Sequence, residues 1–214
     1  SHDHKCLFIH IPRTGGTAFR KFLGIDRNEV EIPASLERIN GKGLLSVCNR
    51  NPELPSNKVP RVVHKEHLCI KHIYQLSLVD NKIYSEYFKF AFVRNPWDRF
   101  VSLWVKFKEE VKLQENFNML YGLNIDHDFK EMEEVLRYLW LSHKRGLALP
   151  RWFKPQYEFV HAKDLKILIN FIGRYETLQD HFDFLCDRID YPHCQLPNSD
   201  KRERRQDKER AHYI

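Results

Sequence analysis

The sequence predicts a three-layer α/β domain with a central, mostly parallel sheet flanked by helices. Apolar runs of strand length alternate along the chain with runs of helical periodicity, which is the pattern of α/β proteins. The run Phe88–Val93 is apolar on both faces apart from Lys89, as in a strand that helices cover on both sides. Two strands also lead through a turn directly into a helix, and in parallel sheets such turns gather at one edge.

In the first half of the chain, an apolar strand over 5–11 precedes a helix that begins after Gly15 and ends near Leu23. Residues 25–59 are rich in proline and glycine, which predicts an irregular functional loop with one helical turn near 35–39. A strand over 59–63 then leads through His64 into a helix over 66–78.

In the second half, the strand Phe88–Val93 is followed by the turn 94–96 and a helix from Trp97 onward. Apolar residues at helical spacing predict another helix over 129–143, and glycine and proline predict a linker over 145–156. A fourth buried strand is expected over 165–171, followed by a helix over 177–189 and a charged, partly helical tail.

Size and composition favour a single domain over residues 1–214, because a chain of this length supplies one substantial core. The hydrophobic content of 42% excludes an intrinsically disordered chain. No apolar run approaches the roughly 20 residues of a membrane span, so no transmembrane segment is predicted in this chain. The five cysteines lack zinc-site spacing, so no metal is predicted, whereas the spacing of Cys186 and Cys194 permits a disulfide.

The formal net charge of +6 favours anionic partners. The basic residues are mostly interleaved with acidic ones, which is typical of a solvated surface. The sequence therefore predicts an anionic ligand but no nucleic-acid partner.

The first turn has the residues of an anion site: Arg13, Thr14, Gly15, Gly16 and Thr17. The glycines let the backbone approach a bulky anion, the threonines add hydroxyl donors, and the arginine adds a positive charge. The turn is not a Walker A loop, because no lysine precedes the threonine of Gly-Gly-Thr. The alternative is an ordinary glycine turn at the start of a helix.

The second turn places Arg94 at the end of a strand, and Ser102 follows eight residues later in the helix. An arginine fork and a serine hydroxyl together suit a phosphate monoester. Alternatively, Arg94 pairs with Asp98 and Ser102 only fills space in the helix. Both turns lead into helix N-termini, which attract anions, so the pair indicates a ligand with two separate phosphate-like groups.

At these residues the chain resembles the sulfotransferases of the heparan type and their bacterial relatives. The segment HIPRTGGTAFRKFLG is similar to their 5′-phosphosulfate loop, and FAFVRNPWDRFVSLW is similar to their 3′-phosphate segment. A later stretch, IGRYETLQDHFDFLCDRI, also resembles the family. The resemblance implies that the three-layer α/β domain is P-loop-like. It also implies transfer of a sulfuryl group from 3′-phosphoadenosine 5′-phosphosulfate, without a metal, to an acceptor hydroxyl on a carbohydrate. It assigns residues 13–17 to the phosphosulfate, and Arg94 and Ser102 to the 3′-phosphate.

The chain departs from the family at Arg13, where these enzymes usually have a lysine. An arginine can offset the charge that builds on the leaving phosphate, as cations do in phosphoryl transfer. It cannot donate a proton, because its pKa lies above about 12.

Sulfuryl transfer to a hydroxyl also needs a base, and an imidazole with a pKa near 6.5 suits this role. His64 is the candidate because it ends a predicted strand at the same sheet edge as both turns, and its segment resembles the family's strand–His–helix element. His67 is the alternative base, and Glu66 is a candidate to orient the imidazole. His64 next to a helix start without a catalytic role, and a purely structural His10, are the simpler interpretations.

The remaining candidates lie in the linker and the tail. Trp152, Gln156 and Tyr157 resemble a family stretch that contacts acceptor or adenine, although simple packing explains them equally well. The basic tail, with Lys201, Arg202, Arg204 and Arg205, resembles a segment that closes over the donor in relatives.

Two other functions stay open at this point: an ATP-dependent kinase of the P-loop type, and a nucleotide- or polyanion-binding module without turnover. The missing Walker lysine argues against the kinase. Acceptor specificity is expected to lie in the loops 25–59 and 109–160.

Overall fold

The computed structural model describes residues 1–23, 38–39, 42–43, 67–75, 80–111, 131–147, 149, 151–162, 164 and 166–196. The chain divides into two compact units. Unit 1 comprises Ser1–Glu31, Glu66–Ser102 and Gln156–Ile214, and unit 2 comprises Ile32–Lys65 and Leu103–Pro155. The single domain over 1–214 stays a prediction.

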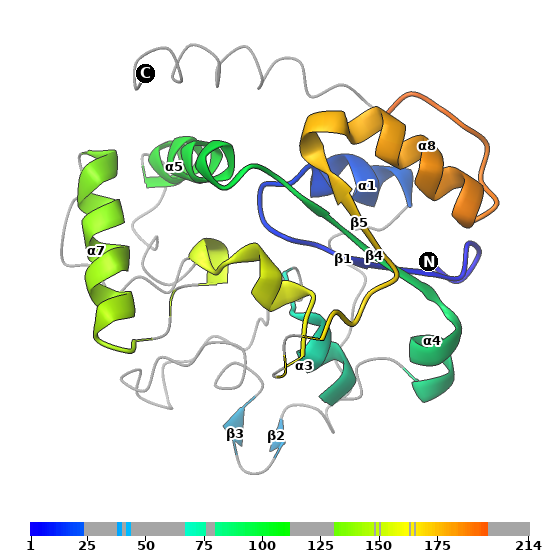
Figure 1. The fold of residues 1–214 in the computed structure, drawn as a ribbon, viewed down its shortest axis with the longest axis horizontal. Coiled ribbons are helices and arrows are strands. Elements are labelled where there is room, and N and C mark those ends of the chain that lie inside the picture. Colours follow the sequence, from blue (N-terminus) through cyan, green and yellow to red (C-terminus); the bar gives the residue numbers. More distant parts are fainter. Residues whose placement is uncertain are drawn as a thin grey trace. The chain divides into compact units, whose positions relative to one another are not determined.

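Unit 1 is built on a parallel sheet of three strands in the order β1-β4-β5 (Figure 1). The strands are β1 (Cys6–Ile9), β4 (Phe88–Val93) and β5 (Phe171–Arg174). Phe8 of β1 pairs with Phe90 of β4, and Phe90 pairs in turn with Phe171 of β5. The predicted α/β class with a parallel sheet is confirmed.

Helices α1 (Gly16–Phe22) and α8 (Leu178–Arg188) cover one face of this sheet. Phe90 and Phe92 point to that face, where the ring of Phe92 stacks on Phe19 at 4.1 Å between centroids. Phe182 of α8 completes the cluster and is fully buried. The period-two alternation of β4 therefore supplies one apolar surface to α1 and α8.

The opposite face of the sheet packs on a second cluster. Ala91 of β4 and Ile9 of β1 lie there with Ile70, the first residue of α3 (Ile70–Gln75), and with Phe159 of the 3₁₀ helix η3 (Gln156–Phe159). Unit 1 thus has the three layers that the sequence predicts.

Lys89 is the one charged side chain of β4 and is nearly buried. Its ammonium group donates to the carbonyl oxygens of Tyr84 at 2.8 Å and Tyr87 at 3.0 Å, at the end of α4 (Asn81–Glu86). Burial lowers its pKa from the usual lysine value. The carbonyl oxygens explain how an otherwise apolar strand tolerates a lysine at this position.

Helix α5 (Pro96–Val111) begins in unit 1 directly after the second turn, as expected from the sequence. Unit 2 contains helix α7 (Met132–Lys144), the 3₁₀ helix η2 (Arg151–Phe153) and two short antiparallel strands, β2 (Arg38–Ile39) and β3 (Lys42–Gly43). None of the helices in the described ranges is both long enough and apolar enough to cross a bilayer.

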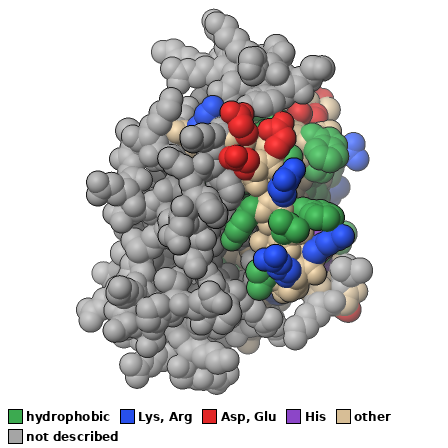
Figure 2. All heavy atoms as spheres, turned by 90° about the vertical axis from the view of Figure 1, so that its left-hand side faces the viewer, with side chains coloured by type: hydrophobic (Ala, Val, Ile, Leu, Met, Phe, Trp, Pro, Cys, Tyr) green, Lys and Arg blue, Asp and Glu red, His purple; other side chains and the backbone are tan. Residues whose placement is uncertain are grey.

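Helix α7 exposes apolar side chains next to basic ones. Trp140 is 54% exposed, and the ammonium group of Lys144 lies 4.2 Å from its ring centroid. Figure 2 shows hydrophobic side chains beside Lys and Arg side chains on the face that carries α7. The ammonium group therefore lies over the indole ring in a cation–π contact.

The structure corrects three predictions of local structure. The strand expected over 165–171 lies later, at β5, because Ile167 of the apolar run is 58% exposed and forms only an isolated bridge with His161. Arg38–Ile39 forms a strand, not the helical turn expected near 35–39. Cys186 and Cys194 are free thiols, and burial raises the pKa of Cys186 to about 11. The strand expected over 59–63 lies outside the described residues.

Gly173 in β5 provides a test of this core. A Cβ atom at this position would lie 2.4 Å from Cε1 of Phe92, whose ring is fully buried against Phe19. We expect Gly173→Ala to lower the free energy of unfolding by about 1–3 kcal/mol, since a close-packed core has no room for the methyl group. Urea denaturation measures the change. The Gly173→Ala/Phe92→Leu double variant should lose less than the sum of its single changes, and strict additivity would contradict the packing described.

Candidate functional site

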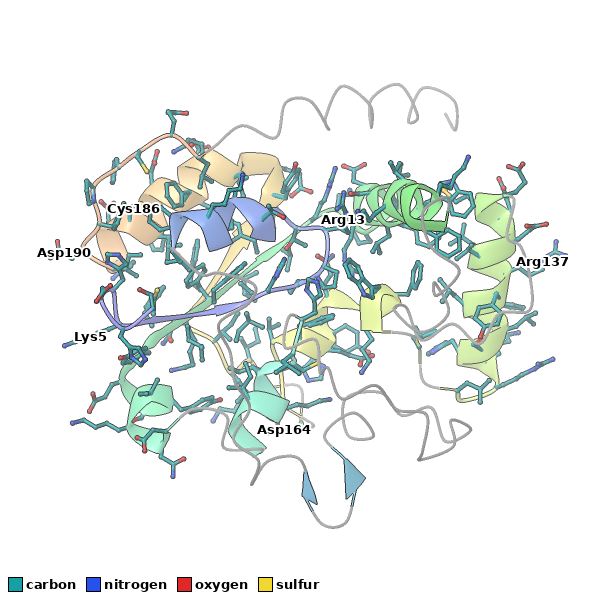
Figure 3. The ribbon with its side chains drawn as sticks, turned by 180° about the vertical axis from the view of Figure 1, so that it is seen from behind. Lys5, Arg13, Arg137, Asp164, Cys186 and Asp190 are labelled. Atoms are coloured by element: carbon teal, nitrogen blue, oxygen red, sulfur yellow. The ribbon has the colours of Figure 1, made fainter. Side chains whose placement is uncertain are left out.

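The turn after β1 has two residues in the left-handed region, Arg13 at φ 65° and Gly15 at φ 87°. The conformation is free of strain for glycine but costs about 1–2 kcal/mol for arginine. Thr14 between them is fully buried, and its hydroxyl donates to the carbonyl oxygen of Ile11 at 3.0 Å. The turn is therefore held in one shape, with Arg13 at its apex between β1 and α1 (Figure 3).

Gly16, the first residue of α1, is in close contact with a histidine ring. A Cβ atom on Gly16 would lie 1.9 Å from Nε2 of His10. That ring is itself held between Phe8, at 5.5 Å between centroids, and His67, at 4.2 Å. Only a glycine fits here, so the second glycine of the motif serves packing within the loop as well as access for a ligand.

The second turn carries Arg94 and Asn95 between β4 and α5. The side-chain oxygen of Asn95 accepts from the backbone N–H of Trp97 at 3.0 Å and of Asp98 at 3.4 Å. These N–H groups of the first helical turn are thus already used by the cap. At this turn we therefore expect side chains, and not the N–H groups of the helix N-terminus alone, to bind an anion.

Within unit 1, two hydrogen bonds join the first turn to helix α5, which follows the second turn. Nε of Arg13 donates to the hydroxyl of Ser102 at 2.9 Å, across 89 residues of sequence. Nε of Arg99 donates to the carbonyl oxygen of Pro12 at 2.9 Å. The ring of Tyr175 lies 3.3 Å from where a Cβ of Gly15 would be.

Tyr175 also supports the second turn, because the guanidinium carbon of Arg94 lies 4.3 Å from its ring centroid. The same aromatic ring therefore lies beside both of the turns that are predicted to bind anions. Arg94 is 8% exposed, so its charge is largely shielded from water. An interaction with an anion is stronger in such buried surroundings than in water.

Arg99 is a structural residue of the site that the sequence reasoning missed. It is 6% exposed, and burial lowers its pKa to about 10, so it stays charged at neutral pH. A charged residue at a buried position of α5, four residues after Asn95, was the available signal. Its hydrogen bond to Pro12 needed the tertiary structure to be seen.

Backbone atoms of the second turn are held by residues from the C-terminal third of the chain. The backbone N–H of Arg94 donates to Oε1 of Gln156 at 2.9 Å, and Nε2 of Gln156 donates to the carbonyl oxygen of Arg94 at 2.7 Å. The N–H of Asn95 donates to the carboxylate of Glu176, in η4 (Tyr175–Thr177). The arginine turn is therefore tied to two further segments.

Of the two candidate bases, the structure describes His67 but not His64. His64 and its neighbour Glu66 lie outside the described residues, so both roles stay predictions. His67 is buried, with φ 67°, and its Nδ1 lies 2.9 Å from the carbonyl oxygen of His10. Since a carbonyl oxygen only accepts, Nδ1 carries the hydrogen, and the neutral ring then has its lone pair on Nε2. The role of His67 as the alternative base also stays a prediction.

The other candidates take ordinary surface positions or cannot be placed. Thr17 is exposed at the start of α1, and Tyr157 is 55% exposed with its ring stacked on His161 at 4.8 Å. Trp152 is half-buried in unit 2. The basic tail residues 201–205 lie outside the described residues. Among those that are described, no cluster of three or more His, Cys, Asp or Glu side chains could hold a metal ion.

Comparisons with known proteins concern the family of the chain and not the roles of single residues. The model of the sulfotransferase family matches residues 1–213. An uncharacterized protein of Archaeoglobus fulgidus is 25% identical over 114 residues, which is 53% of this chain and 77% of that protein. No solved structure matches the chain significantly.

Proposed function

This chain belongs to the sulfotransferase family, and from that we propose that it transfers a sulfuryl group from 3′-phosphoadenosine 5′-phosphosulfate to a hydroxyl group of a carbohydrate. The observation that supports this proposal most strongly is the hydrogen bond of 2.9 Å between Arg13 and Ser102. It links the two segments that we propose to bind anions, as expected for a donor with two separate anionic groups.

Each segment has a role in the proposed site. Residues 13–17, with Arg13, Thr14, Gly15, Gly16 and Thr17, hold the phosphosulfate. Arg94 and Ser102 hold the 3′-phosphate, where an arginine fork and a hydroxyl supply charged and neutral donors. Unit 1 contains all of these residues.

In the proposed reaction, a base removes the proton of the acceptor hydroxyl as its oxygen attacks sulfur. The bond between sulfur and the bridging phosphate oxygen breaks, and 3′-phosphoadenosine 5′-phosphate leaves. Arg13 stabilises the negative charge on the leaving phosphate but supplies no proton. Because Arg13 and Arg94 supply positive charge at both ends of the donor, transfer is predicted to need no metal ion.

A carbohydrate acceptor follows from the resemblance to heparan-type enzymes, and the formal charge of +6 favours an acidic glycan among carbohydrates. The loops 25–59 and 109–160 are proposed to select the acceptor. Incubating the protein with labelled donor and a panel of acidic and neutral glycans tests this choice. Transfer only to non-carbohydrate hydroxyls would contradict it.

The donor assignment is tested by calorimetric titration with 3′-phosphoadenosine 5′-phosphate, ADP and ATP, first without metal and then with Mg²⁺. We expect the 3′-phosphorylated nucleotide to bind most tightly in both conditions. A preference for ATP with Mg²⁺ would instead indicate the kinase, and tight donor binding without turnover on any acceptor would indicate the binding module.

His64→Ala is expected to lower kcat by about 10²- to 10⁴-fold and to leave the affinity for 3′-phosphoadenosine 5′-phosphate unchanged, because a general base acts only on the acceptor proton. Steady-state kinetics and donor titration measure the two quantities. His67→Ala is the matched comparison. A larger loss of kcat in His67→Ala than in His64→Ala would transfer the role to His67.

A further inference from the structure

The side-chain amide of Gln156 makes two hydrogen bonds with the backbone of a single residue 62 positions away. It accepts from the N–H of Arg94 at 2.9 Å and donates to the carbonyl oxygen of Arg94 at 2.7 Å. This paired arrangement reproduces what a neighbouring strand offers in a sheet. Both peptide groups that flank the Arg94 Cα atom are thereby fixed.

Arg94 needs such support because it lies just beyond the sheet. The pairing of β4 with β1 ends at Ala91, and its pairing with β5 ends at Val93, opposite Arg174. Arg94 is the first residue after β4, and neither β1 nor β5 pairs with it. The hydrogen bonds with Gln156 extend the pairing of this chain segment by one residue. That residue, Arg94, is the one whose side chain is proposed to bind phosphate.

The side chain of Arg94 is supported from a second direction. Tyr175 follows Arg174, the last paired residue of β5, and its ring lies 4.3 Å from the guanidinium carbon. A free arginine side chain has about 2 kcal/mol of rotamer entropy to lose on binding, so fixing its backbone and one face reduces that cost.

We propose that Gln156 is a positioning residue that aims Arg94 at the 3′-phosphate and so sets the enzyme's preference for 3′-phosphorylated nucleotides. The inference rests on the proposed function. It differs from the family-based expectation that this residue contacts acceptor or adenine, because here Gln156 acts through Arg94.

The test compares the affinities of 3′-phosphoadenosine 5′-phosphate and adenosine 5′-phosphate, which differ only in the 3′-phosphate. Gln156→Ala removes both hydrogen bonds to Arg94. Gln156→Glu keeps the acceptor for the N–H but places a carboxylate oxygen against the carbonyl oxygen of Arg94. We expect each variant to lower the affinity ratio of the two nucleotides about tenfold, with the affinity for adenosine 5′-phosphate unchanged.

Gln179→Ala is the matched control, since Gln179 also ties backbone groups in unit 1. It donates to the carbonyl oxygen of Cys194 at 3.0 Å and accepts from the N–H of Leu196 at 3.1 Å. This variant should keep the wild-type ratio. The Gln156→Ala/Arg94→Ala double variant should bind the 3′-phosphorylated nucleotide no more weakly than Arg94→Ala alone, because the two residues act as one.

Three outcomes would overturn the inference. An unchanged ratio in both Gln156 variants would show that Arg94 needs no such support. Equal weakening of both nucleotides would show that Gln156 contacts the adenosine portion or serves only the fold. A wild-type protein without preference for the 3′-phosphorylated nucleotide would remove the proposed function itself, and the inference with it.

Discussion

Arg94→Ala is expected to weaken binding of 3′-phosphoadenosine 5′-phosphate by about 100-fold, because each hydrogen bond from a guanidinium to a phosphate contributes roughly 1.5–3 kcal/mol. Arg94 is nearly buried on the ring of Tyr175, so water cannot readily replace the lost donors. Calorimetric titration of the variant and the wild type measures the loss. Adenosine 5′-phosphate, which lacks the 3′-phosphate, should bind both proteins equally.

Arg188→Ala is the matched control for this change. The guanidinium carbon of Arg188 lies 5.0 Å from the ring centroid of Phe184, so it is also an arginine over an aromatic ring in unit 1. It is exposed and belongs to α8, away from both turns in the sequence. A comparable loss of affinity in Arg188→Ala would mean that net charge, not the site, determines binding.

Gly16→Ala is expected to lower donor affinity by about 10- to 100-fold and also to destabilise the protein by about 1–3 kcal/mol. The new methyl group would lie 1.9 Å from Nε2 of His10, and that ring is packed between Phe8 and His67. The loop must shift, so its donors leave the positions that the phosphosulfate requires. Titration and thermal unfolding measure the two effects.

The direction of the stability change in Gly16→Ala shows whether Gly16 packs against His10 or only begins helix α1. Alanine is favoured over glycine in a helix by about 1 kcal/mol, so Gly16→Ala would stabilise α1 if the ring contact did not matter. The Gly16→Ala/His10→Ala double variant removes the ring and should recover most of the donor affinity. Stabilisation by Gly16→Ala alone, or no recovery in the double variant, would contradict the contact.

Much of the architecture could be predicted from sequence because it follows from local patterns. The sequence places the strand Phe88–Val93 correctly, since a run that is apolar apart from Lys89 and ends at an arginine turn has one consistent interpretation. The glycine turn at residues 13–16 was also recognisable, as was its junction with a helix. These features depend on residues that are neighbours in the chain.

The strand β5 was misplaced because its apolar pattern is weak. Gly173 interrupts the short run Phe171–Arg174, whereas the preceding residues 165–169 look more strand-like in sequence. The structure gives the reason for the glycine, since the ring of Phe92 occupies the space of its missing side chain. The partner strand determines this choice of residue, and local sequence does not show the partner.

The links within the site could not be predicted for the same reason. Arg99 contacts Pro12, and Gln156 contacts Arg94, across 87 and 62 residues of sequence. Neither pair has a spacing rule that a single sequence could reveal. The sequence indicated which side chains have the right chemistry, and the tertiary structure shows which of them support one another.

We propose that the two turns hold the two ends of one donor. A crystal structure of the protein with 3′-phosphoadenosine 5′-phosphate bound tests it most directly. We predict the 5′-phosphate against residues 13–17 and the 3′-phosphate within hydrogen-bonding distance of Arg94 and Ser102. A nucleotide bound with only one phosphate at these turns, or bound elsewhere on the molecule, would contradict the account.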